Sequence, residues 1–235
     1  MQDVSSIIAE LQQDFPGIRY VRQVKTGKEA TVHVLGANQG LLALKVYKQD
    51  IKFASRKDYF NQREILESRV GRAIHNNSRF GKKAMLSVWA YREYDALRKL
   101  AESGAAVPGV YKVADNYLLM EFIGHAGIPT PQLYTQKLSR DSAQNCFQQI
   151  AENIEMFWRA GYVHGDLSAY NILWDGERAT IIDFPQVIKL SQTSSAPDRL
   201  LRDIENVDQY FGKYKLADYS ESILELKNLV QEYYL

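Results

Sequence analysis

One stretch of the sequence, YVHGDLSAYNILWDGERATIIDF at residues 162–184, restricts the fold more than any other. Asn171 follows Asp166 by five residues, and Asp183 follows Asn171 by twelve. All three polar residues stand in or beside apolar segments that are typical of short buried strands. Burying a carboxylate or an amide without a partner is costly, so the fold must give these side chains an open edge or a bound partner.

Apolar spacing along the whole chain predicts strands in the first half and helices in the second. Alternating patterns bounded by turn residues predict strands, whereas apolar residues three and four apart predict helices. The expected strands are residues 20–24, 30–36, 41–47, 116–124, 172–174 and 179–182. The expected helices are residues 1–15, 86–103, 141–160, 198–211 and 218–234. This order predicts a β-rich N-terminal lobe, residues 1–123, and a mostly helical C-terminal lobe, residues 124–235.

Residues 55–84 have a different composition from the rest of the N-terminal lobe. They contain eight Lys or Arg residues against three Asp or Glu, with Gly71 and Gly81 among them. We interpret this segment as a partly helical, mobile basic insertion that precedes the helix expected at residues 86–103.

Composition excludes several classes of protein. The net charge is +1 for 235 residues, which argues against general coating of nucleic acid. Cys146 is the only cysteine, so an internal disulfide or a cysteine-based metal cage is excluded. The N-terminus lacks the pattern of a signal peptide, and no apolar run is long enough to span a membrane. These features predict a soluble, cytoplasmic protein without a membrane partner.

The spacing of Asp166, Asn171 and Asp183 indicates phosphoryl transfer. That reaction needs a carboxylate to orient the nucleophile and oxygen ligands to hold Mg²⁺ on the phosphates of ATP. The strands at 172–174 and 179–182 would hold the last two side chains rigidly. A simple turn, with Asn171 as a local backbone cap, is the structural alternative.

Lys45 lies in the apolar strand segment LLALKVYK and resembles the strand lysine of protein kinases, which contacts the α- and β-phosphates. A buried ammonium needs an anionic partner. Glu93 is favoured because it lies on the apolar stripe of the helix at 86–103, and Glu64 is the alternative. If Lys45 were on an edge strand, its amine could instead reach water.

The segment KTGKEATVHV offers a weaker signal. It has one glycine, Gly27, where a glycine-rich phosphate loop would have three. Thr26, Lys28 and the backbone amides of this turn could still reach phosphates.

From about Thr26 to Phe211 the chain resembles the RIO family of atypical serine/threonine protein kinases, in a minimal, bacterial-type version. The basic segment at 55–84 falls where the family has its flexible loop. The matching motifs are TGKEATV (26–32), LALKVYK (42–48), WAYREYDALRKL (89–100), LLMEFIG (118–124), HGDLSAYNIL (164–173) and IIDFPQ (181–186).

The resemblance implies an α+β, two-lobed protein-kinase-like fold with a β-rich N-lobe and a reduced, mostly helical C-lobe. It implies ATP with Mg²⁺ or Mn²⁺ as cofactors, Asp166 as catalytic base, and Asn171 and Asp183 as metal ligands. A phosphoaspartyl intermediate would form at Asp183. Met120 would lie at the gate of the adenine pocket, with backbone groups of the hinge contacting adenine. The implied ATP-binding residues are Thr26, Lys28, Val32, Lys45, Glu93, Met120, Glu121, Ile123 and Ser168.

Some positions depart from these patterns. His33 and Ala169 stand where the family commonly has Tyr and Glu. Ser168 stands where ordinary protein kinases place a lysine, which predicts slow phosphorylation of other proteins. Pro185 replaces the glycine of the usual Asp-Phe-Gly, and its fixed φ predicts a metal loop that does not flip readily.

The expected function is an ATP- and Mg²⁺-dependent RIO-type kinase or ATPase that acts on an unknown protein or on itself. One alternative is a small-molecule kinase of the aminoglycoside or choline phosphotransferase type, which also has a His-Gly-Asp loop. Another is a nucleotide-switched binding module in ribosome maturation, with residues 55–84 on ribosomal RNA.

Overall fold

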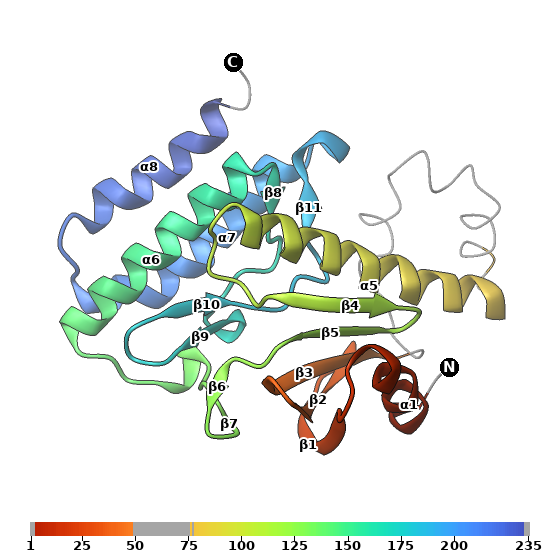
Figure 1. Cartoon of the computed structure of the whole chain (residues 1–235). Coiled ribbons are helices and arrows are strands. Elements are labelled where there is room, and N and C mark those ends of the chain that lie inside the picture. Colours follow the sequence, from red (N-terminus) through yellow and green to blue (C-terminus); the bar gives the residue numbers. More distant parts are fainter. Residues whose placement is uncertain (1–2, 49–75, 77, 233–235) are drawn as a thin grey trace. The chain divides into compact units, whose positions relative to one another are not determined.

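The computed structural model of the chain describes residues 3–48, 76 and 78–232 (Figure 1). Residues 55–75 of the predicted basic insertion lie outside these ranges, and so does the alternative lysine partner, Glu64. Among the residues described, none of the helices combines the length and the apolar character needed to span a lipid bilayer.

The chain divides into two compact units. The first unit combines Met1–Asp95 with Gly109–Phe122, and the second combines Ala96–Pro108 with Ile123–Leu235. The chain therefore passes from one unit to the other three times.

An antiparallel sheet forms the centre of the first unit. In the described part of the chain it has five strands in the order β1-β2-β3-β5-β4. The strands are β1 (Arg19–Thr26), β2 (Ala30–Ala37), β3 (Gly40–Tyr47), β4 (Val110–Ala114) and β5 (Tyr117–Glu121). The predicted turn between the second and third strands is present, and Ala37 pairs with Gly40 across it. Gly40 has φ 124°, a conformation that residues with a Cβ rarely adopt.

Helix α1 (Val4–Asp14) covers one face of this sheet. The side chain of Asp3 begins the helix by accepting the N–H of Ser6 at 2.7 Å. Ile7 and Leu11 are fully buried. The core on this face consists of Ile7, Leu11, Ile18, Leu35, Leu42, Leu44, Val46, Tyr117 and Leu119. Since successive side chains of a strand point to opposite faces, the odd-numbered residues of β3, Lys45 among them, lie on the other face.

Helix α5 (Arg79–Glu102) begins seven residues earlier than the predicted 86–103, so the last six residues assigned to the basic insertion belong to this helix. The reason is a start signal that the sequence analysis missed. The hydroxyl of Ser78 accepts the N–H of Gly81 at 3.0 Å, which satisfies a free amide of the first turn. Trp89 and Glu93 are buried one turn apart on this helix.

Three helices build the second unit: α6 (Arg140–Arg159), α7 (Ala196–Phe211) and α8 (Tyr219–Glu232) (Figure 1). They meet at Phe147 of α6, whose ring centroid lies 5.5 Å from that of Phe211 and 4.7 Å from that of Tyr219. Cys146 is fully buried on the same side of α6. All three helices were predicted, with boundaries within two residues of those observed.

Between its helices, the second unit contains short strand pairs and 3₁₀ turns. The pairs are β6 (Gly124–His125) with β7 (Ile128–Pro129), β8 (Tyr162–Val163) with β11 (Ile188–Lys189), and β9 (Ile172–Trp174) with β10 (Ala179–Ile181). The 3₁₀ turns are η1 (Leu133–Thr135), η2 (Ala169–Asn171), η3 (Leu190–Gln192) and η4 (Gly212–Tyr214). Apart from β9 and β10, these elements are too short to give a periodic pattern, so they were not predicted.

The segment after α5 is fixed within the second unit by Ala106. Its N–H donates to Oδ1 of Asn153 on α6 at 2.6 Å, and its carbonyl accepts the N–H of Ile181 on β10 at 2.8 Å. These bonds hold β10 against α6 and so set the position of the residues that follow the strand.

Candidate functional site

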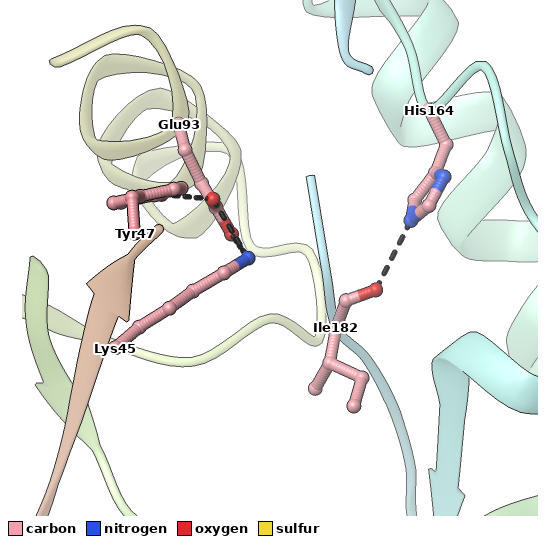
Figure 2. Close-up of polar contacts among 5 residues, drawn as sticks. All are labelled: Lys45, Tyr47, Glu93, His164 and Ile182. Atoms are coloured by element: carbon pink, nitrogen blue, oxygen red, sulfur yellow. Dashed lines mark hydrogen bonds and ion pairs between the residues drawn. The ribbon is translucent and has the colours of Figure 1, made fainter. Parts of the chain in front are cut away.

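Lys45 and Glu93 form a buried ion pair in the first unit. Nζ of Lys45 lies 2.8 Å from Oε1 and 2.9 Å from Oε2 of Glu93, and the two residues are 5% and 1% exposed. The hydroxyl of Tyr47 donates to Oε2 of the same carboxylate. Figure 2 shows both β3 side chains directed at Glu93 on α5. The structure thus gives Lys45 the partner predicted from the helix stripe.

Burial gives this ion pair an energetic consequence. Removing one charge from a buried pair leaves the other uncompensated, which typically costs about 3–5 kcal/mol. The ammonium of Lys45 also lies 5.4 Å from the ring centroid of Tyr47, within the range of a cation–π interaction. The position of the amine is therefore fixed by three contacts before any ligand binds.

The sheet places other predicted ATP-binding residues on the face that carries Lys45. Val32 of β2 is directly opposite Lys45, and Met120 of β5 is opposite Ala43. Residues paired in this way share a face, and Ala43 lies two residues from Lys45 on the same strand. The side chains of Val32, Lys45 and Met120 therefore line the face of the sheet opposite α1.

The predicted phosphate turn connects β1 with β2. Thr26 pairs with Thr31, and the N–H of Gly27 donates to the carbonyl of Ala30 at 2.9 Å. The carbonyl of Gly27 accepts from Nζ of Lys48 at 2.7 Å. Lys28 is exposed at the tip of the turn.

The hinge residues Glu121 and Ile123 each use one backbone group within the protein. The N–H of Glu121 donates to the carbonyl of Gly109 at 2.7 Å, and the Glu121 carboxylate accepts the N–H of Gly109 at 3.1 Å. The carbonyl of Ile123 accepts the N–H of Thr130 at 3.1 Å. The N–H of Glu121 and the carbonyl of Ile123 therefore already have partners within the protein.

The HGD loop, residues 164–171, lies in the second unit and is held from beneath by α7. The carboxylate of Asp203 accepts the N–H groups of Gly165 and Leu167, each at 2.8 Å. Asp203 is 1% exposed. Burial raises the pKa of Asp203, while His164 and the two N–H groups oppose that shift. Asn206, one turn further along α7, donates from Nδ2 to the carbonyl of Leu167 at 2.9 Å.

His164 connects the HGD loop to the metal loop, residues 181–186. Its Nε2 lies 3.1 Å from the carbonyl of Ile182 (Figure 2). Its Nδ1 accepts the N–H of Asp166 at 3.3 Å. These partners assign the proton to Nε2, because a carbonyl accepts and an amide donates. The imidazole of His164 is therefore hydrogen-bonded to both the HGD loop and the metal loop and fixes the distance between them.

Gly165 allows the two loops to approach closely. Its φ is +82°, and a Cβ at this position would lie 2.6 Å from the carbonyl oxygen of Gln186. Real Cβ atoms essentially never come so close to a backbone oxygen, so any other residue would push the metal loop away.

Asn171 is oriented by the HGD loop itself. Its Nδ2 donates to the carbonyl of Asp166 at 2.8 Å, and its backbone carbonyl accepts the N–H of Ile182 at 2.9 Å. Because the amide nitrogen is bound, the amide oxygen is directed away from Asp166 and is the atom offered to a ligand. The structural alternative, Asn171 as a local backbone cap, is thus present, and the metal-binding role of Asn171 stays a prediction.

Asp166 and Asp183 interact electrostatically within the second unit. Partial burial is the largest effect that raises the pKa of Asp166, and the charge of Asp183 raises it further. His164, Arg199 and Arg202 act in the opposite direction. The effect of Asp183 on Asp166 is the repulsion expected between two nearby carboxylates, which a bound cation would relieve.

The backbone of the metal loop is unusual at Asp183, where φ is 70°. Non-glycine residues in this region are uncommon and carry strain that surrounding contacts must hold. Phe184 is fully buried, with its ring centroid 4.6 Å from that of His164 and 5.6 Å from that of Phe157. These contacts fix the loop immediately after Asp183.

Four supporting residues were missed by the sequence analysis. Tyr47 had a usable signal, because a residue two positions from Lys45 on a strand must share its face. Asp203 also had one, since it interrupts the apolar stripe of α7. His164 and Asn206 had none. Ser168, predicted to bind ATP, lies in the HGD loop, where its carbonyl accepts the N–H of Asn171 at 2.9 Å.

Comparison with known proteins gives consistent results. A family model described as the RIO domain matches residues 30–223. The serine/threonine-protein kinase RIO1 of Caenorhabditis elegans is 30% identical over 189 residues, which cover 80% of this chain and 36% of that protein. The RIO-type serine/threonine-protein kinase Rio1 of Haloferax volcanii is 29% identical over 204 residues, which cover 86% of this chain and 66% of that protein.

A solved structure with the same fold is the Rio2 kinase of Chaetomium thermophilum in an ADP/Mg²⁺-phosphoaspartate complex. Its TM-score is 0.66 at 16% sequence identity, with 99% of this chain and 75% of that chain covered. The two-lobed kinase-like fold predicted from the sequence is thereby confirmed. The chain spans from about a third to two thirds of the length of the two RIO1 proteins above. Since the RIO model covers most of this chain, the chain belongs to the RIO domain family.

Proposed function

We propose that the protein is an ATP- and Mg²⁺-dependent serine/threonine kinase of the RIO type. The observation that carries the proposal is the buried pair of Lys45 and Glu93. A lysine held by a glutamate from a helix is the group that positions the α- and β-phosphates in kinases. A purely structural pair at this depth contributes little stability compared with apolar residues, which favours a functional reason for keeping it.

Asn171 and Asp183 would hold the metal ion. The amide oxygen of Asn171 is directed outward by the bond from its nitrogen to Asp166, and Asp183 is exposed. In the described part of the chain, no three His, Cys, Asp or Glu residues cluster to hold a metal alone. This donor set fits Mg²⁺, which is commonly bound by one or two protein oxygens together with substrate phosphates and water. Bound there, the ion would neutralise charge on the phosphates.

Asp166 is assigned as the base. Its carboxylate would accept the proton of the attacking hydroxyl, while the hydroxyl oxygen bonds to the γ-phosphorus and the bond from that phosphorus to ADP breaks. His164 and Asp203 position Asp166 through the backbone of the HGD loop. In the absence of an acceptor, an oxygen of Asp183 would bond to the γ-phosphorus as the bond from that phosphorus to ADP breaks. Water would then hydrolyse the aspartyl phosphate and release inorganic phosphate and the free Asp183 carboxylate.

The phosphoaspartate step is suggested by the Rio2 kinase of C. thermophilum, which is known as an ADP/Mg²⁺-phosphoaspartate complex. Ser168 supplies no positive charge beside Asp166, so we expect transfer to other proteins to be slow relative to hydrolysis of ATP. The expected substrate is a protein or the chain itself.

The deciding experiment is incubation with ATP labelled at the γ-phosphate, followed by counting of label in inorganic phosphate, in the chain and in added protein. Mg²⁺-dependent release of phosphate that is lost in Asp183→Asn, together with label on the chain that is sensitive to acid, to base and to hydroxylamine and is absent from that variant, would identify the aspartyl route. Label on small alcohols would instead favour a small-molecule kinase. ATP binding without turnover would favour a nucleotide-switched module.

A further inference from the structure

A second segment of the chain holds the backbone around Asn171. This segment, residues 131–136, contains the 3₁₀ turn η1, and we call it the η1 segment. It lies antiparallel to β9, the strand that begins immediately after Asn171, and Gln132 is bridged to Leu173 of that strand. The η1 segment and the proposed metal ligand are therefore neighbours within the second unit.

The peptide group between Tyr170 and Asn171 is hydrogen-bonded at both ends. Its N–H, which belongs to Asn171, donates to the carbonyl of Ser168 at 2.9 Å. Its carbonyl, which belongs to Tyr170, accepts a hydrogen bond from Nε2 of Gln132. A peptide group is planar, so bonds at both ends fix the orientation of the whole plane. This plane sets the φ angle of Asn171 and with it the direction in which the Asn171 side chain leaves the backbone.

The ring of Tyr170 is held by the same segment. It stacks on the ring of Tyr134, with the two centroids 4.1 Å apart and the ring planes inclined by 28°. The two residues are 54% and 51% exposed, so core packing does not account for this contact. Stacking of aromatic rings is favourable beyond the area that it buries. The η1 segment thus holds Tyr170 both at its carbonyl and at its ring.

The η1 segment is itself fixed within the second unit. Leu133 is fully buried, and its carbonyl accepts the hydroxyl of Tyr210 on α7 at 3.0 Å. The carbonyl of Gln132 accepts the N–H and the hydroxyl of Thr135, at 3.0 Å and 2.7 Å. Gln132 and Tyr134 stand on either side of the buried Leu133, so their contacts with η2 start from a rigid base.

We propose that Gln132 and Tyr134 are positioning residues for the metal ion: they hold the peptide group that orients the amide of Asn171. The proposal rests on the proposed function and adds two residues to its metal site. The turn η2 is a single 3₁₀ turn, in which hydrogen bonds are less well aligned than in an α-helix, so outside support matters there. Mg²⁺ requires nearly ideal octahedral geometry, which a loosely held ligand would not supply. Both residues act through Tyr170 and not on the reacting atoms.

Binding of Mn²⁺ tests the proposal without requiring turnover. Mn²⁺ is titrated into the full chain with an equal concentration of ADP, and the sharp paramagnetic resonance signal of free Mn²⁺ measures the unbound ion. A titration without protein corrects for Mn²⁺ held by ADP in solution. We expect Gln132→Met and Tyr134→Ala each to weaken Mn²⁺ binding about tenfold, as is typical of residues that orient metal ligands. Tyr134→Phe keeps the ring and should bind Mn²⁺ as tightly as the unaltered chain.

Gln136→Met is the matched control. Nε2 of Gln136 donates to the carbonyl of Trp174 at 2.8 Å and to that of Pro131 at 3.3 Å, so this glutamine joins the same segment to β9 but not to η2. Gln136→Met and Gln132→Met both remove a bond to a backbone carbonyl and should both lower the melting temperature. Only Gln132→Met should weaken Mn²⁺ binding. Equal weakening would show that metal binding follows the general stability of the segment, and the proposal would be wrong.

Hydrogen exchange at the amide of Asn171 separates this proposal from the proposed function, because it is measured without metal or nucleotide. Exchange should be at least about fivefold faster in Gln132→Met and Tyr134→Ala and unchanged in Gln136→Met. Unchanged exchange in all three variants would overturn the proposal, whether or not the chain binds Mn²⁺. If the unaltered chain binds no Mn²⁺ with ADP, the proposed function fails, and the exchange rates still decide whether the two residues hold Asn171.

The exposed ring pair could instead serve as a docking surface for the acceptor, and kinetics distinguish this role. If Tyr134→Ala raised KM for a protein acceptor but kept the Mn²⁺ affinity of the unaltered chain, the rings would contact the acceptor and the proposal would be overturned. If it raised the Mg²⁺ concentration needed for half-maximal activity and left KM for the acceptor unchanged, the positioning role would be supported.

Discussion

The carboxylate of Asp203 lies 2.8 Å from the backbone nitrogen of Gly165, although 38 residues separate the two in the sequence. An equal bond reaches Leu167, so one buried side chain fixes both neighbours of Asp166. The position of the proposed base therefore depends on a helix that contributes no reacting atom. Removal of the Asp203 bonds should therefore lower both the stability of the HGD loop and the activity of the protein.

Asp203→Ala should lower the free energy of unfolding by about 3 kcal/mol, because it leaves two backbone donors without their acceptor. Urea unfolding followed by circular dichroism measures this loss. Glu205→Ala, an exposed position on the same helix, should change the free energy by less than about 0.5 kcal/mol. Equal effects of the two substitutions would show that the Asp203 bonds do not stabilise the loop.

Gly165→Ala should be more damaging than Gly161→Ala, although the two glycines have nearly the same φ, +82° and +83°. Both alanines incur the cost of a left-handed backbone, about 1–2 kcal/mol. At Gly165 the new Cβ also meets the carbonyl of Gln186 at 2.6 Å, whereas nothing lies within 4 Å at Gly161. The difference between their melting temperatures isolates the clash. Matching temperatures would contradict the close approach of the two loops.

Glu93→Gln should lower the free energy of unfolding by about 3–5 kcal/mol, because Lys45 would be left buried without its counter-charge. Replacement of the whole cluster by Lys45→Met, Glu93→Leu and Tyr47→Phe should recover most of this stability, since no buried charge remains. ATP binding, measured by calorimetry, should be lost in both variants. If the triple variant still bound ATP, Lys45 and Glu93 would not be part of the nucleotide site.

His33 should make the protein less stable in mild acid. It is buried, its Nδ1 has no hydrogen-bond partner among the described residues, and burial lowers its pKa from 6.5. The folded state thus binds this proton less readily than the unfolded state. The contribution of neutral His33 is present above pH 6.5 and decreases as the pH falls below that value toward the folded-state pKa. Melting temperatures from pH 8 to pH 5 should fall less steeply for His33→Phe, and parallel curves would count against this assignment.

Pro185→Gly should loosen the metal loop. Proline restricts φ, so its replacement enlarges the unfolded ensemble and should lower the free energy of unfolding by about 0.4–1 kcal/mol. The amide of Val187 donates to the carbonyl of Phe184 at 3.1 Å and reports locally on the loop. Its hydrogen exchange should accelerate more than that of amides in α6. Unchanged exchange at Val187 would mean that the buried Phe184 ring alone holds the loop.

Residues with a strong periodic pattern were predicted well. The helices of the second unit and the first three strands were predicted from the spacing of their apolar residues. This spacing places those side chains in the core, as on β3, where Leu42 and Leu44 face the α1 core. Family and fold were confirmed, because their motifs are long. The start of α5 was placed too late, since its signal is a single hydroxyl, that of Ser78, and lies in a stretch dominated by charge.

The candidate site was only partly accessible from the sequence. Glu93 could be paired with Lys45 because a charge on an apolar stripe needs a partner. The link from Asp203 to Gly165 could not be predicted, since it joins a helix to a distant loop through backbone groups that every sequence possesses. The roles of Asp166, Asn171 and Asp183 in catalysis and metal binding remain predictions that the experiments above address.

The single thiol of the chain, on the buried side of α6, has a practical consequence. Burial raises the pKa of Cys146 to about 12, so almost none of it is thiolate at neutral pH. Thiolate is the reactive form, and maleimide should therefore leave the native protein unmodified. Spin labels introduced through new cysteines at Lys28 and Glu205, both exposed, would then carry no background signal. The distance between the two units could therefore be measured in solution, with and without nucleotide, without first replacing Cys146.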